Sequence, residues 1–233
     1  MKVMSFNTQN CLNYRTKKID FEVMAKAIND AEVDLVGLQE MRGVGERADY
    51  EAQTEKLSAL TGMPYCYFAK ATYFEGEGPF GNAILSKIPF ESVETVPIPD
   101  PCPHGYEGYY ETRALLRARL TNGVTVLITH FGLNPDEKEN AVGTVLAHIK
   151  DEKCILMGDF NLLPDAPLLL PIRERMKDTA ALFGEETYSF PSDNPTRKLD
   201  YIFVSPDAVV EAADILPVVA SDHRPYVATV CFE

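Results

Sequence analysis

The sequence predicts one domain of the α/β or α+β class, in which packed β-sheets are covered by helices. Three observations predict it: short apolar runs of strand length, three segments of helical period between them, and a strong hairpin signal. The 233 residues, 45% of them hydrophobic, are enough for one substantial core. Because no linker-like, repetitive or low-complexity tract divides the chain, we expect a single domain over residues 1–233.

In the N-terminal half, the pattern predicts strands that alternate with two helices. Residues 2–6 alternate in polarity and run into a polar cluster, as a strand entering a loop does. Apolar residues recur at helical spacing over 21–31, so an amphipathic helix is expected there. The apolar run 34–39 predicts a buried strand that delivers Glu40 at its carboxyl end, and 50–60 predicts a second helix. Further strands are expected near residues 65–71, 82–86 and 92–97.

In the C-terminal half, the dipeptide Asn122-Gly123 gives the strongest local signal. Asn-Gly between two apolar runs is typical of a tight hairpin, here joining strands over 112–120 and 124–129. The Pro-rich segment 97–108 before it is expected to be irregular. A helix is predicted over 135–149, with Pro135 in its first turn, where a missing N–H costs nothing. The remaining strands are expected at residues 154–157, 199–204, 209–216 and 226–232.

Polar residues of the types that act in catalysis follow several of these apolar runs. Strand ends in layered sheets converge on one rim, where clefts collect catalytic groups. Each residue taken singly is compatible with ordinary turn chemistry, so the set carries more weight than any member. Its members are Glu40, His130, Asp159, Asn161 and His223.

The charge and the cysteines narrow the classes of function. The net charge is −13, from 22 basic and 35 acidic side chains, and such a field repels the nucleic-acid backbone at long range. It disfavours duplex DNA and fits a small phosphorylated substrate better. The five cysteines are odd in number and widely spaced without a Cys-x-x-Cys pair, which argues against a disulfide framework and a zinc knuckle.

The hydropathy of the chain bears on its location. No apolar stretch reaches the ~18 residues that a membrane-spanning helix needs. No signal peptide is recognisable, because the first predicted strand begins almost at Met1. A cytoplasmic location is therefore the default expectation, and no protein partner is evident from the sequence.

Taken in chain order, the polar residues belong to a series of short motifs. These are SFNTQN with Asn7, Gln39-Glu40, GNAILS over 81–86, Glu111-Thr112-Arg113, Thr129-His130, Gly158-Asp159-Phe160-Asn161, LDYIF over 199–203 and Ser221-Asp222-His223. The series spans essentially the whole chain and resembles the endonuclease/exonuclease/phosphatase family, which includes DNase I, exonuclease III, neutral sphingomyelinases, inositol polyphosphate 5-phosphatases and deadenylases. The resemblance implies a DNase I-like four-layer α/β sandwich, with two packed mixed β-sheets flanked by helices.

The resemblance also implies hydrolysis of phosphate esters with Mg²⁺ or Mn²⁺. Glu40 resembles the family's main metal carboxylate, with Asn7 beside it and Asp222 helping to hold the metal. His223 resembles the family's histidine on the phosphate, and Asp200 resembles its partner. A hard cation held by carboxylates and waters suits Mg²⁺, and it can act as a Lewis acid and lower the pKa of bound water.

The remaining motif residues are expected to act on water and substrate. Asp159 resembles the group that orients or deprotonates the attacking water, and Asn161 a donor to the phosphoryl group. His130 and Arg113 are expected to neutralise phosphoryl charge. Asn82 joins the expected substrate-binding set through the GNAILS motif.

Three functional hypotheses remain from the sequence. The first is a metal-dependent phosphodiesterase or phosphatase acting on a small or lipid-derived ester. The second is a DNA or RNA nuclease of the same family, for which a basic groove would draw on Arg15, Lys17, Lys18, Arg197 and Lys198. The third is a catalytically inactive scaffold, which the retention of every expected motif residue disfavours. His130 stands where abasic-site nucleases carry tyrosine, which points to the phosphatase, sphingomyelinase and deadenylase branches.

Overall fold

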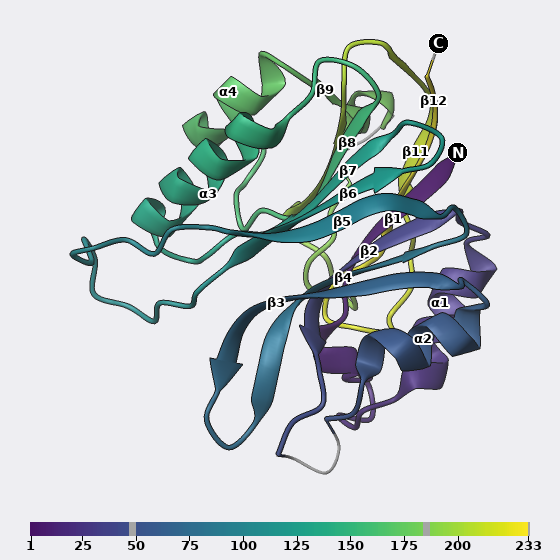
Figure 1. Ribbon diagram of the computed structural model, residues 1–233, viewed down its shortest axis with the longest axis vertical. Helices are drawn as coiled ribbons and strands as arrows, with labels where there is room; N and C mark the ends of the chain where they lie inside the picture. Colours follow the sequence, from purple (N-terminus) through teal and green to yellow (C-terminus); the bar gives the residue numbers. More distant parts are fainter. Residues whose placement is uncertain (47–49, 184–186, 233) are drawn as a thin grey trace.

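The structure is a computed structural model that describes residues 1–46, 50–183 and 187–232. Two six-stranded sheets lie face to face (Figure 1). In spatial order the first contains β11 (Ala208–Ile215), β12 (Tyr226–Phe232), β1 (Lys2–Asn7), β2 (Leu35–Arg42), β4 (Gly78–Ser86) and β3 (Tyr65–Phe74). The second contains β5 (Phe90–Pro97), β6 (Ala114–Leu120), β7 (Thr125–His130), β8 (Cys154–Asp159), β10 (Asp200–Val204) and β9 (Lys177–Asp178). The pairs β1–β2 and β7–β8 are parallel and the other pairs antiparallel, so both sheets are mixed.

Helices cover the outer faces of both sheets. The first sheet carries α1 (Phe21–Asp30) and α2 (Gln53–Thr61), and the second carries α3 (Pro135–His148) and the short α4 (Leu170–Arg173) (Figure 1). Short 3₁₀ turns lie at Gln9–Cys11, Pro167–Leu169 and Thr179–Leu182. The four layers confirm the predicted DNase I-like sandwich.

Strand periodicity explains why three apolar cores form. Successive side chains of a strand point to opposite faces. In β1, Val3 therefore packs into the core between the sheets, whereas Met4 packs beneath α1 against Met24. The sheets approach closely at Gly37, where an added Cβ would lie 2.9 Å from the side chain of Ile128. Strands buried on both faces need apolar residues on both, which matches the continuous apolar runs of the sequence.

The predicted elements agree with the observed ones in kind, and they differ at some ends. The hairpin β6–β7 turns at Gly123, whose φ is +87°, as the Asn-Gly signal predicted. The helix predicted from residue 50 begins only at Gln53, whose side-chain oxygen accepts a hydrogen bond from the Arg42 backbone instead. The two-residue strand β9 and the four-residue α4 are too short to leave a periodic pattern, and the sequence reading missed both.

The segment between β5 and β6 is irregular, as predicted, but it is held firmly against α3. Asp136 in the first turn of α3 accepts hydrogen bonds from the backbone N–H of Gly105 and the hydroxyl of Tyr110 at 2.9 Å each. Farther along α3, Asn140 donates to the carbonyl of Pro99. These contacts fix the path of the chain as it enters β6, where part of the site lies. Within the described residues, no helix combines the length and apolarity needed to cross a bilayer.

Candidate active site

A cleft of about 670 Å³ opens where the two sheets meet. Its lining residues come from strands and loops of both sheets, far apart in the chain. The charged and polar members are Asn10, Glu40, Arg42, Glu75, Glu77, Glu111, Arg113, His130, Asp159, Asn161, Asp222 and His223. The apolar and aromatic members are Phe74, Phe80, Tyr109, Leu133 and Phe190. The cleft thus combines many acidic groups with two arginines and two histidines.

Glu40 enters the cleft from a distortion inside β2. The pairing of β2 with β4 shifts register between Leu38 and Met41, and Glu40 has a φ of +57°. Bulges of this kind redirect a side chain, and a left-handed conformation costs a non-glycine residue about 1–3 kcal/mol. Asn161, just after β8, also has a positive φ of +50°, a conformation that asparagine adopts more readily than glutamate. The prediction that Glu40 follows the strand end is therefore wrong: the strand continues to Arg42, and the bulge presents the carboxylate.

His130 and Asp159 are the last residues of β7 and β8, as the sequence predicted to within one or two residues. These strands are parallel neighbours, so both side chains reach the same rim. Gly158 permits the close approach just before Asp159. Its φ is +154°, and an added Cβ would lie 1.9 Å from the carbonyl oxygen of Thr129. Only glycine fits this position without moving β7.

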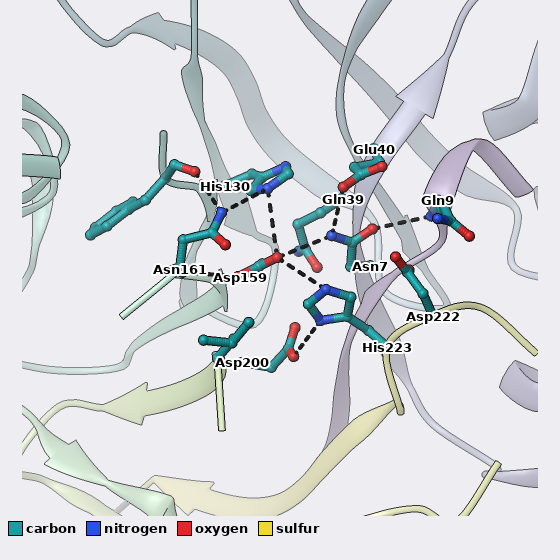
Figure 2. Close-up of polar contacts among 12 residues, drawn as sticks. Asn7, Gln9, Gln39, Glu40, His130, Asp159, Asn161, Asp200, Asp222 and His223 are labelled. Atoms are coloured by element: carbon teal, nitrogen blue, oxygen red, sulfur yellow. Dashed lines mark hydrogen bonds and ion pairs between the residues drawn. The ribbon is translucent and has the colours of Figure 1, made fainter. Parts of the chain in front are cut away.

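Asn7 links the carboxylates of the two sheets. Its amide nitrogen Nδ2 donates to Glu40 Oε1 at 3.0 Å and to Asp159 Oδ2 at 3.1 Å (Figure 2). Its Oδ1 accepts from the backbone N–H of Gln9 at 3.1 Å. Because a backbone N–H can only donate, this contact fixes which way the amide faces. Asn7 therefore acts here as a donor between two acids, and its expected role as a metal ligand stays a prediction.

His223 lies opposite, on the loop that leads into β12. Its Nδ1 is 2.8 Å from Asp200 Oδ2, and its Nε2 is 3.5 Å from Asp159 Oδ2 (Figure 2). The ring of Phe190 packs against the imidazole with 4.8 Å between centroids. Asp200 is completely buried as the first residue of β10, so it acts through His223. The expected partnership of Asp200 with the histidine is present in the structure.

Burial and charge shift the proton affinities of this group. Burial opposes charge on His223, but the carboxylates of Asp200 and Asp159 outweigh it and raise the pKa of the imidazole above its usual range. Burial also raises the pKa of Asp159, against the attraction of His223. The arrangement favours a charged His223 beside a carboxyl group of increased basicity, which suits a group that orients or accepts a proton from water.

His130 is held differently. Its Nδ1 is 2.9 Å from Arg113 Nη1, and its Nε2 lies 3.6 Å from Asp159 Oδ2. Burial, Arg113 and His223 lower the pKa of His130 well below its usual range. Asn161 lies beside it, with its Nδ2 donating to the Phe131 carbonyl at 3.0 Å and 3.3 Å from His130 Nε2 (Figure 2). His130 is therefore a neutral imidazole in this arrangement.

The donor set suits a hard divalent cation. Glu40 and Asp222, the two acids expected to hold a metal, line the same cleft, and the carboxylate assigned to water, Asp159, lines it too. Burial raises the pKa of Glu40; the Asn7 hydrogen bond opposes this rise, and the charge of Asp222 adds to it. Such crowding of carboxylates is relieved by a cation, and oxygen ligands are those that Mg²⁺ and Mn²⁺ prefer.

A second set of side chains, two acids and a histidine, also has the spacing of a metal site. One potential ligand atom each from Asp159, Asp200 and His223 lies within 4.8 Å of the others. Asp200 and His223 already bond to each other at 2.8 Å, so they are better described as a hydrogen-bonded pair than as two free ligands.

The structure brings together every residue of the predicted site except Asn82. Asn82 is buried outside the cleft lining, and its Nδ2 donates to the carbonyl of Ala114 at 2.9 Å, joining β4 of one sheet to β6 of the other. In the structure this side chain joins the two sheets, and its expected contact with substrate stays a prediction.

The sequence analysis missed the far end of the cleft. Arg42 lies there with its Nη2 2.8 Å from Glu77 Oε2, and Phe74 and Tyr109 line the walls. No motif marks these residues. Arg42 and Phe74 end β2 and β3 about three residues beyond the predicted strand ends, Glu77 lies in the hairpin after β3, and Tyr109 lies in an irregular segment.

Comparison with known proteins agrees with this geometry. The sequence profile of the Endonuclease/Exonuclease/phosphatase family matches residues 4–223. The uncharacterized protein YbhP of Escherichia coli K12 is 24% identical, over 96% of this chain and 93% of its own.

Two solved structures share the fold over 100% of this chain. The endonuclease/exonuclease/phosphatase of Beutenbergia cavernae has a TM-score of 0.79 and 22% sequence identity, and the match covers 71% of its chain. A mannosyl-6-phosphatase of Bacteroides thetaiotaomicron has a TM-score of 0.75 and 16% sequence identity, and the match covers 100% of its chain. With the family profile spanning the four layers and the whole cleft, this chain belongs to the endonuclease/exonuclease/phosphatase family.

Proposed function

We propose that this protein is a hydrolase of phosphate esters that depends on Mg²⁺ or Mn²⁺, in which water attacks phosphorus in line with the leaving group. One observation carries the proposal: a single carboxylate oxygen, Asp159 Oδ2, has three site groups around it. Asn7 Nδ2 lies at 3.1 Å, His223 Nε2 at 3.5 Å and His130 Nε2 at 3.6 Å. An acid surrounded by donors at the rim of a cleft matches the needs of in-line phosphoryl transfer to water.

Glu40 and Asp222, with Asn7 beside them, would hold the cation. When bound, it supplies Lewis-acid stabilisation of the phosphoryl oxygens and a more acidic water. Asp159 is assigned to orient the attacking water and accept its proton. The Nε2 of His223 faces the cleft while Asp200 holds Nδ1, so His223 is assigned to donate to a phosphoryl oxygen.

The cleft favours a small or lipid-derived phosphate ester over nucleic acid. Its two arginines are each paired with an acid: Arg42 with Glu77 at 2.8 Å and Arg113 with Glu111 at 2.6 Å. Their charge is thus largely compensated before a substrate arrives. A groove that follows a polynucleotide backbone needs an uncompensated positive stripe, and the net charge of −13 opposes one.

The basic residues considered for a nucleic-acid groove do not form one at this cleft. Lys198 is buried, with its Nζ 3.4 Å from the centroid of the Tyr201 ring. Lys17 lies over the ring of Tyr14, and neither Lys17 nor Arg197 is among the residues that line the cleft. These placements support the small-substrate form of the proposal.

The test is hydrolysis of bis(p-nitrophenyl) phosphate and p-nitrophenyl phosphate with Mg²⁺ or Mn²⁺, with and without EDTA. A panel of sugar phosphates, nucleotides, phospholipids and oligonucleotides follows; sugar phosphates are included because the Bacteroides relative is a mannosyl-6-phosphatase. We expect activity that EDTA removes and that Asp159→Asn lowers by several orders of magnitude. The matched control Asp165→Asn changes an exposed acid and should retain activity.

Two results would contradict the proposal. Absence of hydrolysis with every divalent metal would favour the scaffold hypothesis. Cleavage confined to oligonucleotides would favour the nuclease and overturn the assignment to small esters.

A further inference from the structure

The guanidinium of Arg113 bridges an acid and a histidine at the wall of the cleft. Its Nη1 is 2.6 Å from Glu111 Oε1 and 2.9 Å from Nδ1 of His130. The side chains of Arg113 and Glu111 are only 10% and 12% exposed. One terminal nitrogen therefore lies between both neighbours: it forms an ion pair with the acid and a hydrogen bond with the imidazole.

This contact determines where the proton of His130 lies. A guanidinium has donors only, so the imidazole nitrogen facing it must accept. In a neutral imidazole the other nitrogen then carries the hydrogen. That nitrogen, Nε2, lies 3.6 Å from Asp159 Oδ2 and 3.3 Å from the amide nitrogen of Asn161 (Figure 2). The Asn161 amide nitrogen also only donates, but it already donates to the Phe131 carbonyl at 3.0 Å, so the shorter contact with the charged Arg113 determines which imidazole nitrogen accepts. Protonating Nδ1 as well would set an N–H against the N–H of Arg113 and break their hydrogen bond.

We propose that Arg113, held by Glu111, is a positioning residue that fixes His130 as the neutral Nε2–H tautomer. His130 then meets the phosphoryl group as a hydrogen-bond donor, and His223 is the cation of the pair. The tautomer stands on the contacts of this chain alone, whereas its use toward a phosphoryl oxygen rests on the proposed function. Arg113 acts on the substrate through His130 and is not itself required to touch it.

The surroundings of Arg113 are built to hold it in place. The backbone N–H of Glu111 donates to Glu137 Oε1 at 3.1 Å. Glu137 is a buried member of the capping box at the start of α3, where its other oxygen accepts from Asn134. The segment that carries Glu111 and Arg113 is thereby fixed to a helix end, so the guanidinium has little freedom to leave His130.

Two of the charged groups around His130 oppose its protonation, and the third, a carboxylate, favours hydrogen on Nε2. Arg113 faces it from the start of β6, His223 from the loop before β12, and Asp159 from the end of the neighbouring β8. Burial and the two cationic neighbours disfavour a charged imidazole, which agrees with the lowered pKa of His130.

Histidine-selective nitrogen-15 NMR of the full chain tests the proposal directly, since imidazole nitrogens with and without hydrogen resonate far apart. His130→Gln assigns the signal. In the wild-type protein we expect Nδ1 of His130 without hydrogen and Nε2 with it, at about pH 8 and still at about pH 5.5, below the ordinary histidine pKa of about 6.5. In Arg113→Met we expect a mixture of tautomers and protonation at the lower pH. Arg117→Met, which removes a half-buried arginine paired with Glu94, is the matched control and should leave the signal unchanged.

Kinetics adds a second readout, with bis(p-nitrophenyl) phosphate and Mn²⁺. We expect Arg113→Met to lower kcat about 10- to 100-fold, by analogy with partners that orient metal-binding histidines. Arg113→Lys should recover part of this loss, because an ammonium also offers only donors. A wild-type His130 with hydrogen on Nδ1, or an Arg113→Met spectrum identical to wild type, would overturn the proposal. The wild-type spectrum alone shows which nitrogen of His130 carries the hydrogen, even if a variant fails to fold. It does so whether or not the protein hydrolyses the ester.

Discussion

Asp200→Asn is the variant that most sharply separates the chemistry of the site from the stability of the fold. Asp200 and His223 are buried and 2.8 Å apart, and the substitution keeps the shape of the side chain while removing its charge. The new amide can also present a donor to Nδ1, which would favour the wrong tautomer of His223.

The size of the effect follows from that one contact. A buried hydrogen bond to a charged group contributes about 1.5–3 kcal/mol, and each 1.36 kcal/mol is a factor of ten in rate. Loss of the charge alone therefore predicts a fall in kcat of about 10- to 150-fold. A tautomer change would add to this, since the equivalent substitution in a serine-protease triad costs about 10⁴.

The assay is steady-state hydrolysis of bis(p-nitrophenyl) phosphate at saturating Mn²⁺, with circular dichroism to confirm the fold. Asp151→Asn is the matched control, because Asp151 is an exposed acid whose ion pair with Arg175 at the surface contributes little. A folded Asp200→Asn protein with kcat within about twofold of wild type would refute the role given to Asp200.

Three further predictions concern stability. Because His130 stays neutral in the fold, the unfolding free energy of the metal-free protein should fall as pH drops below about 6.5, where the unfolded chain binds a proton that the fold excludes. Urea titrations in EDTA should show that this free energy falls less steeply with pH in His130→Gln, and equal dependence on pH in both proteins would contradict the prediction. Gly158→Ala should lower the unfolding free energy by at least about 2–4 kcal/mol because its Cβ meets the Thr129 carbonyl, whereas Gly76→Ala, with open space around it, should lower it by only about 1–2 kcal/mol. Equal losses of Tm in the two variants would be inconsistent with the tight contact. Mn²⁺ at about 100 times its Kd should add about 2.7 kcal/mol to the unfolding free energy, and Glu40→Gln should abolish this increase. A rise in Tm with Mn²⁺ that persists in Glu40→Gln would place the metal elsewhere.

The sequence predicted the parts of the fold that depend on local pattern. Strand and helix periods, the turn at Gly123 and, to within two residues, the ends of β7 and β8 at His130 and Asp159 depend on nearby residues. Parallel pairing of β7 with β8 then brings those two side chains to one rim, as the strand-end argument expected.

The remaining features depend on contacts between distant segments. The bulge that presents Glu40 arises where β2 pairs with β4, and neither strand alone signals it. Asn82 belongs to a family motif, yet its amide joins the two sheets and lies outside the cleft. Arg42 is held at the cleft by residues far from it in the chain, among them Glu77 of the β3–β4 hairpin and Asn10. Such partners are chosen by tertiary packing, which sequence periodicity does not encode.

A crystal structure of the protein with Mn²⁺ and inorganic phosphate tests the central claim most directly. The account predicts one Mn²⁺ within about 2.2 Å of a Glu40 carboxylate oxygen, a distance close to that of other hard divalent ions. It also predicts a phosphate oxygen within hydrogen-bond distance of Nε2 of both His223 and His130. Manganese bound away from Glu40, or phosphate bound outside the cleft, would contradict it.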